Sequence, residues 1–227
     1  MTRLRSGLIP PLLALLAAAG LAGCGSDSGA PYKEYGQAVG QAFRSMFKAN
    51  SVPRSTVAGI PYASMGYRVD GGDEAVLVLA TSSPDYQLWT ASSHVVFQTS
   101  NGRILRTVGL AQDLGGMTPD HGSALPGPAA ALAAPFSSRR LADFPQANAY
   151  GILIACTATA RGAAPITLLG QSLPTQRVDE NCESRSLNWR FTDTYWVDPK
   201  SGFVWRSLQH LTPQGETVET EIFRPPG

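Results

Sequence analysis

The stretch SLNWRFTDTYWVDPKSGFVWRSLQHLTP, residues 186–213, decides the fold of this chain. Over residues 187–197 apolar side chains alternate with polar ones, a two-residue period that is typical of a strand with one packed face. The segment DPKSG, residues 198–202, then reverses the chain, because proline sets φ at the second turn position and glycine accepts the left-handed conformation. Residues 203–211 return antiparallel. The stretch therefore predicts a β-hairpin rich in large aromatic residues.

A second hairpin is predicted over residues 94–110, HVVFQTSNGRILRTVGL. Asn101-Gly102 is the pair that a type I′ turn favours, because both of its central residues need positive φ. The side chains around this turn cannot all lie on one face of regular strands. We therefore expect either a bulge or a sheet that is buried on both sides.

The remaining patterns extend the sheet and add one helix. Further strands are expected over 74–80, 85–91, 148–158, 164–170 and 216–225. Residues 32–49 place apolar side chains on one helical face, but two glycines weaken this helix, so it needs a sheet to lie on. We predict a mainly β fold: a single domain over 32–227 with a large bent antiparallel sheet, half-barrel-like, and one N-terminal helix packed on it.

Residues 112–135 have no period and are rich in Gly, Pro and Ala. A connection of this length is uncommon in a compact domain unless it is functional or mobile. The segment could alternatively mark a boundary between two lobes.

The N-terminus has the layout of a secretory signal, with Arg3 and Arg5 before an apolar run over 8–19. The run is too short to cross a bilayer, and two prolines interrupt it. The string LAGC, ending at Cys24, resembles the bacterial lipobox, whose cysteine receives fatty acyl chains such as palmitate. An ordinary cleaved signal with an incidental cysteine is the alternative. We predict a signal peptide over 1–23, lipidation of Cys24 and a tether over 24–31.

Lipidation would fix where the protein works. Each buried methylene contributes about 0.8 kcal/mol, so two or more chains anchor a protein stably. The tether beyond Cys24 reaches no more than roughly 25 Å at about 3.4 Å per residue, so the folded body would lie close to the bilayer. Gly25 and Ser26, rather than Asp, resemble the outer-membrane sorting signal of enteric lipoproteins. The expected location is the periplasmic face of the outer membrane.

Charge and cysteine content narrow the classes of function. The chain has 18 Lys+Arg against 17 Asp+Glu, a net charge of +1, and only 15% charged residues. This composition lacks the basic footprint of a nucleic-acid-binding protein and suits contact with protein partners or neutral polymers. An exported chain folds under oxidising conditions, so Cys156 and Cys182 could form a disulfide contributing about 3 to 4 kcal/mol. Two separate buried thiols are the alternative.

The sequence contains none of the local signatures of catalysis, such as G-x-S-x-G, H-E-x-x-H or C-x-x-C. Asp179, Glu180 and Glu183 could act as acid–base groups or metal ligands, but we expect an acidic surface turn over 172–184. A catalytic triad assembled in space stays open, because such groups meet in the fold and not in the sequence. We predict no catalytic residues, no metal and no cofactor.

Exposed aromatic rings often stack on sugars, whereas buried rings simply fill a core. The candidate interaction surface comprises Trp89, Arg106, Trp196 and Trp205. Core packing of the tryptophans is the alternative.

The order of these features resembles the YjbF family, also called the group 4 capsule polysaccharide lipoprotein family. Its two most specific blocks are NGRILRTVGL at 101–110 and WVDPKSGFVW at 196–205, one on each predicted hairpin. The resemblance implies a mainly β lipoprotein at the outer membrane, encoded with genes for exopolysaccharide or capsule production. It supplies no catalytic residues, and residues 112–135 do not match it.

The expected function is that of a non-catalytic accessory in exopolysaccharide or capsule export or assembly. Its partners would be the outer membrane through the lipid anchor, and export or assembly proteins or the glycan itself. One alternative is a carrier of a lipid or glycan intermediate, which needs a large internal cavity. A second is a polysaccharide-modifying hydrolase or lyase, in which one of the three carboxylates would meet His94 or His210 in a cleft.

Overall fold

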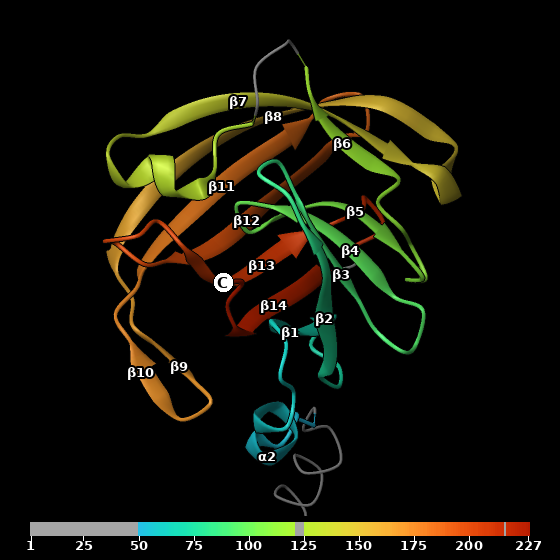
Figure 1. Ribbon diagram of the computed structural model, residues 1–227. Coiled ribbons are helices and arrows are strands. Elements are labelled where there is room, and N and C mark those ends of the chain that lie inside the picture. The colour runs from blue at the N-terminus through green and yellow to red at the C-terminus, as the bar shows by residue number, and fades with distance from the viewer. Residues whose placement is uncertain (1–49, 121–124, 216) are drawn as a thin grey trace, which may run out of the picture. The chain divides into compact units, whose positions relative to one another are not determined.

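The computed structural model describes residues 50–120, 125–215 and 217–227, and the regular secondary structure of this part is almost entirely β (Figure 1). The strands of the first half are β1 (Ser64–Val69), β2 (Ala75–Ser82), β3 (Gln87–Thr90), β4 (Val96–Ser100), β5 (Arg103–Val108) and β6 (Gly116–Pro119). Those of the second half are β7 (Phe136–Phe144), β8 (Ala149–Ala163), β9 (Ile166–Leu168), β10 (Gln171–Leu173), β11 (Gln176–Ser184), β12 (Trp189–Val197), β13 (Val204–His210) and β14 (Thr217–Arg224). The helices are α2 (Arg54–Ala58) and the 3-10 turns η1 (Pro128–Leu132) and η2 (Pro145–Ala147). No helix within these ranges is long and apolar enough to cross a membrane.

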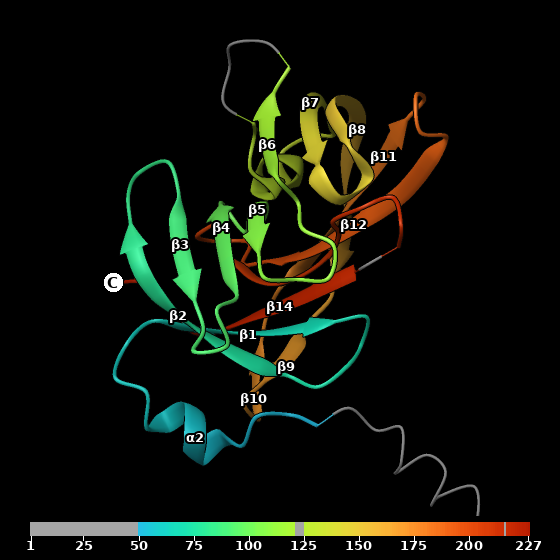
Figure 2. The same cartoon turned by 90° about the vertical axis from the view of Figure 1, so that its right-hand side faces the viewer.

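Twelve strands form one antiparallel sheet in the order β5-β4-β3-β2-β1-β14-β13-β12-β11-β8-β7-β6. Strands that follow one another in sequence are neighbours, with two exceptions: β5 and β6 stand at opposite ends of the order, and the β9–β10 hairpin lies between β8 and β11 in the sequence. The first and last strands, β1 and β14, pair with each other. The sheet curls until its two ends, β5 and β6, come into contact, which makes it nearly barrel-shaped (Figures 1 and 2).

The prediction of a mainly β fold with one large bent antiparallel sheet is therefore confirmed. The helix expected over 32–49, the signal peptide over 1–23 and the tether over 24–31 lie outside the described residues. The described helix α2 has only five residues and was not expected from the sequence.

The hairpin at Asn101-Gly102 forms as predicted, between β4 and β5. Asn101 has φ 49° and Gly102 has φ 77°, and a bulge falls between Gln98 and Thr99. A Cβ on Gly102 would lie 2.5 Å from the Cβ of Val204. Glycine is needed here both for its backbone conformation and for the close approach of β13.

The aromatic-rich hairpin predicted over residues 186–213 also forms, as β12 and β13. The Asp198 carboxylate accepts hydrogen bonds from the backbone N–H groups of Lys200 at 2.7 Å and Ser201 at 2.9 Å, which lower the pKa of Asp198. Gly202 ends the turn at φ 74°. A bulge between Trp196 and Val197 then tightens the twist of the ribbon.

Two segments that the sequence predicted to be a loop and a turn contain strands or a 3-10 helix. Residues 112–135 include β6 and η1, and η1 packs on β8, β11 and β12 rather than separating two lobes. The acidic surface turn predicted over 172–184 is wrong, because most of this segment is β11. Its inward positions are Val178, Glu180, Cys182 and Ser184, so the period of two was present in the sequence.

The concave side of the sheet is filled by side chains. The largest fully buried apolar ones are Trp89, Tyr195, Phe97, Phe144 and Leu77. At the seam between β5 and β6, Thr107 N–H donates to Leu114 O, and Leu114 N–H donates to the Thr107 hydroxyl, both at 2.9 Å. Side chains and one backbone bond thus hold the two ends of the sheet together.

Candidate functional site

An open groove of about 1110 Å³ lies over β7, β8, β11 and β12. Side chains that alternate away from the core form most of its lining, and we call this surface the outer groove. Its described lining comprises Ser137, Ser138, Arg139, Leu153, Ala155, Cys156, Thr157, Asn181, Cys182, Glu183, Arg185, Ser186, Arg190, Phe191 and Thr192.

Strand register aligns polar side chains into a row across all four strands of the outer groove. Ser137 lies opposite Thr157, Thr157 opposite Asn181, and Asn181 opposite Thr192. The Ser137 and Thr157 hydroxyls are 3.3 Å apart, and the Thr192 hydroxyl donates to Asn181 Oδ1 at 2.8 Å. Hydroxyl and amide groups can both donate and accept hydrogen bonds. This hydroxyl row is therefore a continuous strip of small hydrogen-bonding groups.

The adjacent row carries charge. Arg139, Ala155, Glu183 and Arg190 lie opposite one another in turn across the same four strands. Arg190 Nη2 lies 3.2 Å from Glu183 Oε1, and the Arg190 side chain is 78% exposed. Arg139 pairs with Asp120 at 3.0 Å and is also largely exposed. Arg185, at the end of the groove, forms no side-chain ion pair within the described part of the chain.

On the other side of the hydroxyl row, Asp179 lies between Thr159 and Thr194. Its carboxylate binds Arg177 at 2.6 Å and Arg161 at 3.1 Å. Burial would raise the pKa of Asp179, but its bonds to Arg177 and Arg161 outweigh that effect and lower it. Asp179 is therefore ionised and tied to its neighbours.

The inner face of these strands carries a buried charge network. Glu180, on β11, accepts hydrogen bonds from Arg103 Nη2 at 2.7 Å and from Arg140 Nη1 at 2.9 Å. The Arg140 Nη2 atom lies 3.3 Å from Asp193 Oδ2 on β12. These four side chains are at most 3% exposed. Two cations balance two anions, which is what allows charge to be buried at all.

Burial by itself would raise the pKa of the Glu180 carboxyl, but the charges of Arg140 and Arg103 outweigh it and hold the pKa at about 2. Burial would lower the pKa of Arg103, yet Glu180 raises it above its usual value. Tyr195 is buried beside Asp193 and Glu180, so its pKa lies well above the usual 10. Glu180 and Arg103 are thus charged, and Tyr195 neutral, at physiological pH.

The network also closes the sheet. Arg103 belongs to β5 at one end of the strand order, whereas Arg140 belongs to β7 beside the other end. Gln209, on β13, donates from Nε2 to Gly102 O at 3.0 Å and accepts at Oε1 from Ile104 N–H at 2.9 Å. An unpaired buried backbone group costs about 1–3 kcal/mol. The Gln209 amide satisfies Ile104 N–H and Gly102 O, and so takes the place of the neighbouring strand that β5 lacks on this side.

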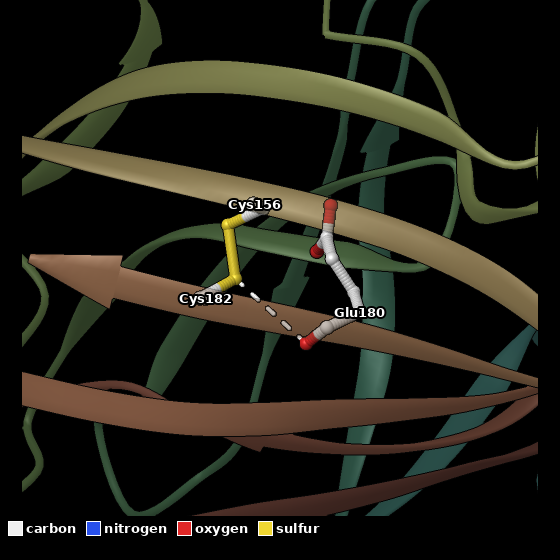
Figure 3. Close-up of side chains that lie close together, drawn as sticks. All are labelled: Cys156, Glu180 and Cys182. Atoms are coloured by element: carbon white, nitrogen blue, oxygen red, sulfur yellow. Dashed lines mark hydrogen bonds between the residues drawn. A yellow bond between two sulfur atoms is a disulfide. The ribbon is translucent and has the colours of Figure 1, made fainter.

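Cys156 and Cys182 form a disulfide between directly opposed residues of β8 and β11, with their Cα atoms 4.1 Å apart. Figure 3 shows the bridge beside Glu180, with the Cys182 sulfur 3.8 Å from the backbone oxygen of Glu180. The ligand atoms of the three residues lie within 4.8 Å of one another, as metal ligands would. However, the sulfurs are bonded to each other and the carboxylate is held by two guanidinium groups. This cluster therefore offers no free metal ligands.

The four residues of the candidate interaction surface do not form one surface. Trp89 is 1% exposed and donates from Nε1 to the Thr99 hydroxyl at 3.0 Å, so its inclusion was wrong. Trp196 and Trp205 are half-buried on the neighbouring strands β12 and β13, whereas Arg106 is exposed on β5. None of the four lines the outer groove as described.

The three carboxylates singled out from the sequence are also separated by the fold. Glu180 lies on the inner face, and Glu183 and Asp179 lie on the outer face, each paired with arginine. Instead, Asp193 meets His210, with Oδ1 3.3 Å from Nδ1, while its other oxygen lies beside Arg140. The signal for Asp193 was its position in phase with the packed residues of β12.

Comparison with known proteins gives consistent matches. The family described as "Group 4 capsule polysaccharide lipoprotein gfcB, YjbF" matches residues 39–223. The "Uncharacterized lipoprotein GfcB" of Escherichia coli (strain K12) is 25% identical over 221 residues, which cover 95% of this chain and 98% of that protein. The crystal structure of the hypothetical lipoprotein YmcC from Escherichia coli (K12) matches with a TM-score of 0.67 at 20% identity, over 89% of this chain and 100% of that one. This second likeness shows a shared fold.

Proposed function

This chain belongs to the group 4 capsule polysaccharide lipoprotein family, and from that premise we propose that it assists the export or assembly of an exopolysaccharide or capsule without catalysis. In this proposal acyl chains on Cys24 anchor it to the outer membrane, and its β domain works in the periplasm. The folded domain contacts the glycan, the export proteins or both.

The observation that carries this proposal is the outer groove. It is an open groove, and a row of small hydroxyl and amide side chains on four adjacent strands lines one edge of it. Small-molecule sites are usually concave and mostly apolar, and they enclose their ligand. The outer groove is open rather than enclosed, and it combines apolar side chains with the hydroxyl row. Such a surface suits a long chain of sugars, which presents both C–H faces and hydroxyl groups and can enter and leave from the sides.

A non-catalytic role agrees with how the carboxylates are held. Among the described lining residues of the outer groove, Glu183 is the one carboxylate, and it pairs with Arg190. A glycoside hydrolase needs two carboxyl groups that flank the scissile bond. Glu180 lies behind the same strand, held between Arg103 and Arg140. These contacts favour an accessory over a glycoside hydrolase.

The carrier alternative requires a large apolar interior. A cavity of about 290 Å³ lies at one end of the sheet, between the Asn101-Gly102 and Ser201-Gly202 turns. Its described lining includes Gln87, Thr99 and Thr220. This volume falls at the lower limit of ligand sites, about 300 Å³, and polar groups line part of it. The interior thus gives little support to a lipid carrier.

The test is complementation of a strain from which the gene has been deleted. We expect deletion to lower the amount or surface delivery of the exopolysaccharide, and the native gene to restore it. Ala155→Trp places a large ring in the outer groove and should restore less, whereas Ala134→Trp, at an exposed position outside the described lining, should restore fully. Unchanged exopolysaccharide amount, length and delivery after deletion would contradict the proposal.

The anchor has a separate test. Cys24→Ala should release the protein into the periplasmic fraction, while the native protein should sediment with outer membranes on a density gradient. Sedimentation of Cys24→Ala with membranes would show that something other than acyl chains holds the protein there.

A further inference from the structure

We propose that the outer groove binds an acidic polysaccharide, whose carboxylates are held by Arg139, Arg185 and Arg190 and whose hydroxyls bond to the hydroxyl row. This inference rests on the proposed function and specifies its ligand class. The ligand is a pyranose chain that carries uronic acid or similar carboxylate groups.

The lining of the outer groove carries an excess of positive charge. The described lining of the outer groove contains three guanidinium groups and one carboxylate, although the whole chain has a net charge of only +1. A neutral polymer was expected from the sequence because the net charge of the whole chain is close to zero. Locally the outer groove is cationic, and Arg185 has no ion-pair partner among the described residues.

The ion pairs of the other two arginines are easily exchanged. Arg190 and Arg139 are largely exposed, and each lies about 3 Å from a single carboxylate oxygen. Exposed ion pairs of this kind contribute only about 0–1 kcal/mol. A ligand carboxylate that accepts two parallel bonds from a guanidinium can therefore replace them or join them. Buried Arg103 and Arg140 lack this freedom, because Glu180 already binds both.

The spacing of the strands beneath the outer groove matches the repeat of a sugar chain. Neighbouring strands lie about 4.8 Å apart, so β7, β8, β11 and β12 span roughly 14 Å. The repeat of an extended pyranose chain is close to this strand spacing. A glycan that runs across the strands can therefore present successive sugars to Ser137, Thr157, Asn181 and Thr192, while its carboxylates face the parallel row of Arg139 and Arg190. The small side chain of Ala155, between these two arginines, leaves room for the chain.

The test measures binding to the full-length lipoprotein in detergent by calorimetry at low salt. The probes are oligogalacturonate and the same oligomer with its carboxylates methyl-esterified. We expect the acid to bind at least tenfold more tightly than the ester. The double variant Arg185→Gln/Arg190→Gln should lose at least tenfold in affinity for the acid. Arg106→Gln, which removes an exposed cation outside the described groove lining, should bind within twofold of the native protein.

Three results would overturn the inference. They are equal binding of acid and ester, unchanged binding by the double variant, and equal binding of poly-glutamate, which carries carboxylates without sugars. Thermal melting should show each variant folded, since the substituted side chains are exposed.

The two proposals fail in different ways. If acid and ester bind equally and Ala155→Trp still impairs export, the ligand class is wrong and the accessory function stands. If neither oligomer binds and the deletion leaves export unchanged, both proposals fall.

Discussion

The two faces of the strands around β11 use charged residues in opposite ways. On the inner face, Glu180 is 1% exposed and lies between two guanidinium groups that are at most 3% exposed. Three residues further along the same strand, Glu183 is on the outer face and shares one exposed ion pair with Arg190. The two glutamates differ in the side of the sheet to which the period of two directs them. Charge on the inside closes the sheet, whereas charge on the outside remains available to a ligand.

This difference has energetic consequences. Removing one member of a buried, paired set leaves the others charged and unsolvated, which costs several kcal/mol. Removing one member of an exposed pair costs little, because water replaces the partner. Substitutions on the inner face should therefore act on stability, and those on the outer groove should act on binding.

The largest effect is expected for Glu180→Gln. Arg103 and Arg140 would remain buried without their shared counterion, and we expect the free energy of unfolding to fall by about 3–5 kcal/mol in urea denaturation. The matched control, Glu183→Gln on the same strand, should change it by less than about 0.5 kcal/mol. If the two variants lost similar amounts of unfolding free energy, charged residues on the inner and outer faces would not differ in their effect on stability.

The disulfide should come next. It links residues 26 apart, and replacing both Cys156 and Cys182 with Ala should lower the free energy of unfolding by about 3 to 4 kcal/mol in the chain-entropy account. Thermal melting of the double variant, against native protein with and without a reductant, measures the loss. A native melting temperature in the double variant would mean that the bridge contributes nothing to the folded state.

Acid should weaken the inner face gradually. The folded pKa of Glu180, about 2, lies below the ordinary value of 4.5, so its stabilising effect is complete above about pH 4.5 and is lost as the pH falls toward 2. The urea concentration at the unfolding midpoint, measured from pH 6 to pH 2.5, should stay level down to about pH 4.5 and then decrease. The fall should be shallower in Glu180→Gln, but not absent, because the pKa values of Asp179 and Asp198 are also lowered. An identical pH dependence in that variant would show that Glu180 is not the responsible group.

The smallest effect on stability is expected in the hydroxyl row. Asn181→Ala should leave the free energy of unfolding within about 0.5 kcal/mol, because the side chain is exposed. It should weaken oligogalacturonate binding about fivefold, the equivalent of one hydrogen bond of about 1 kcal/mol. Isothermal titration and a melting curve on the same sample separate the two readouts. Loss of stability without loss of binding would place Asn181 among the structural residues.

The parts of the fold that local chemistry sets could be predicted from the sequence. Asn101-Gly102 and residues 198–202 supply the backbone conformations that their turns require, and both hairpins form there. The pairing of β1 with β14 could not be predicted, because it joins segments about 150 to 160 residues apart with no local signal. The contact of β5 with β6 depends on the curvature of all twelve strands.

The candidate site was less accessible to sequence reasoning. Glu180 and Asp193 occupy inward positions of the adjacent strands β11 and β12. Because carboxylates usually face water, the sequence around Glu180 was nevertheless predicted to be a surface turn. Their burial depends on Arg103 and Arg140, which come from distant strands. The hydroxyl row likewise exists only once the register of four strands is known.

The most direct test of the separation between the faces is methyl NMR of the full-length lipoprotein titrated with oligogalacturonate. Thr157 and Thr192 report on the outer groove, whereas Ile154 and Ala158, on the same strand as Thr157, report on the inner face. We predict progressive shifts of the two threonine methyls with little movement of Ile154 and Ala158. Shifts confined to the inner methyls, or no shifts at all, would contradict the assignment of binding to the outer groove.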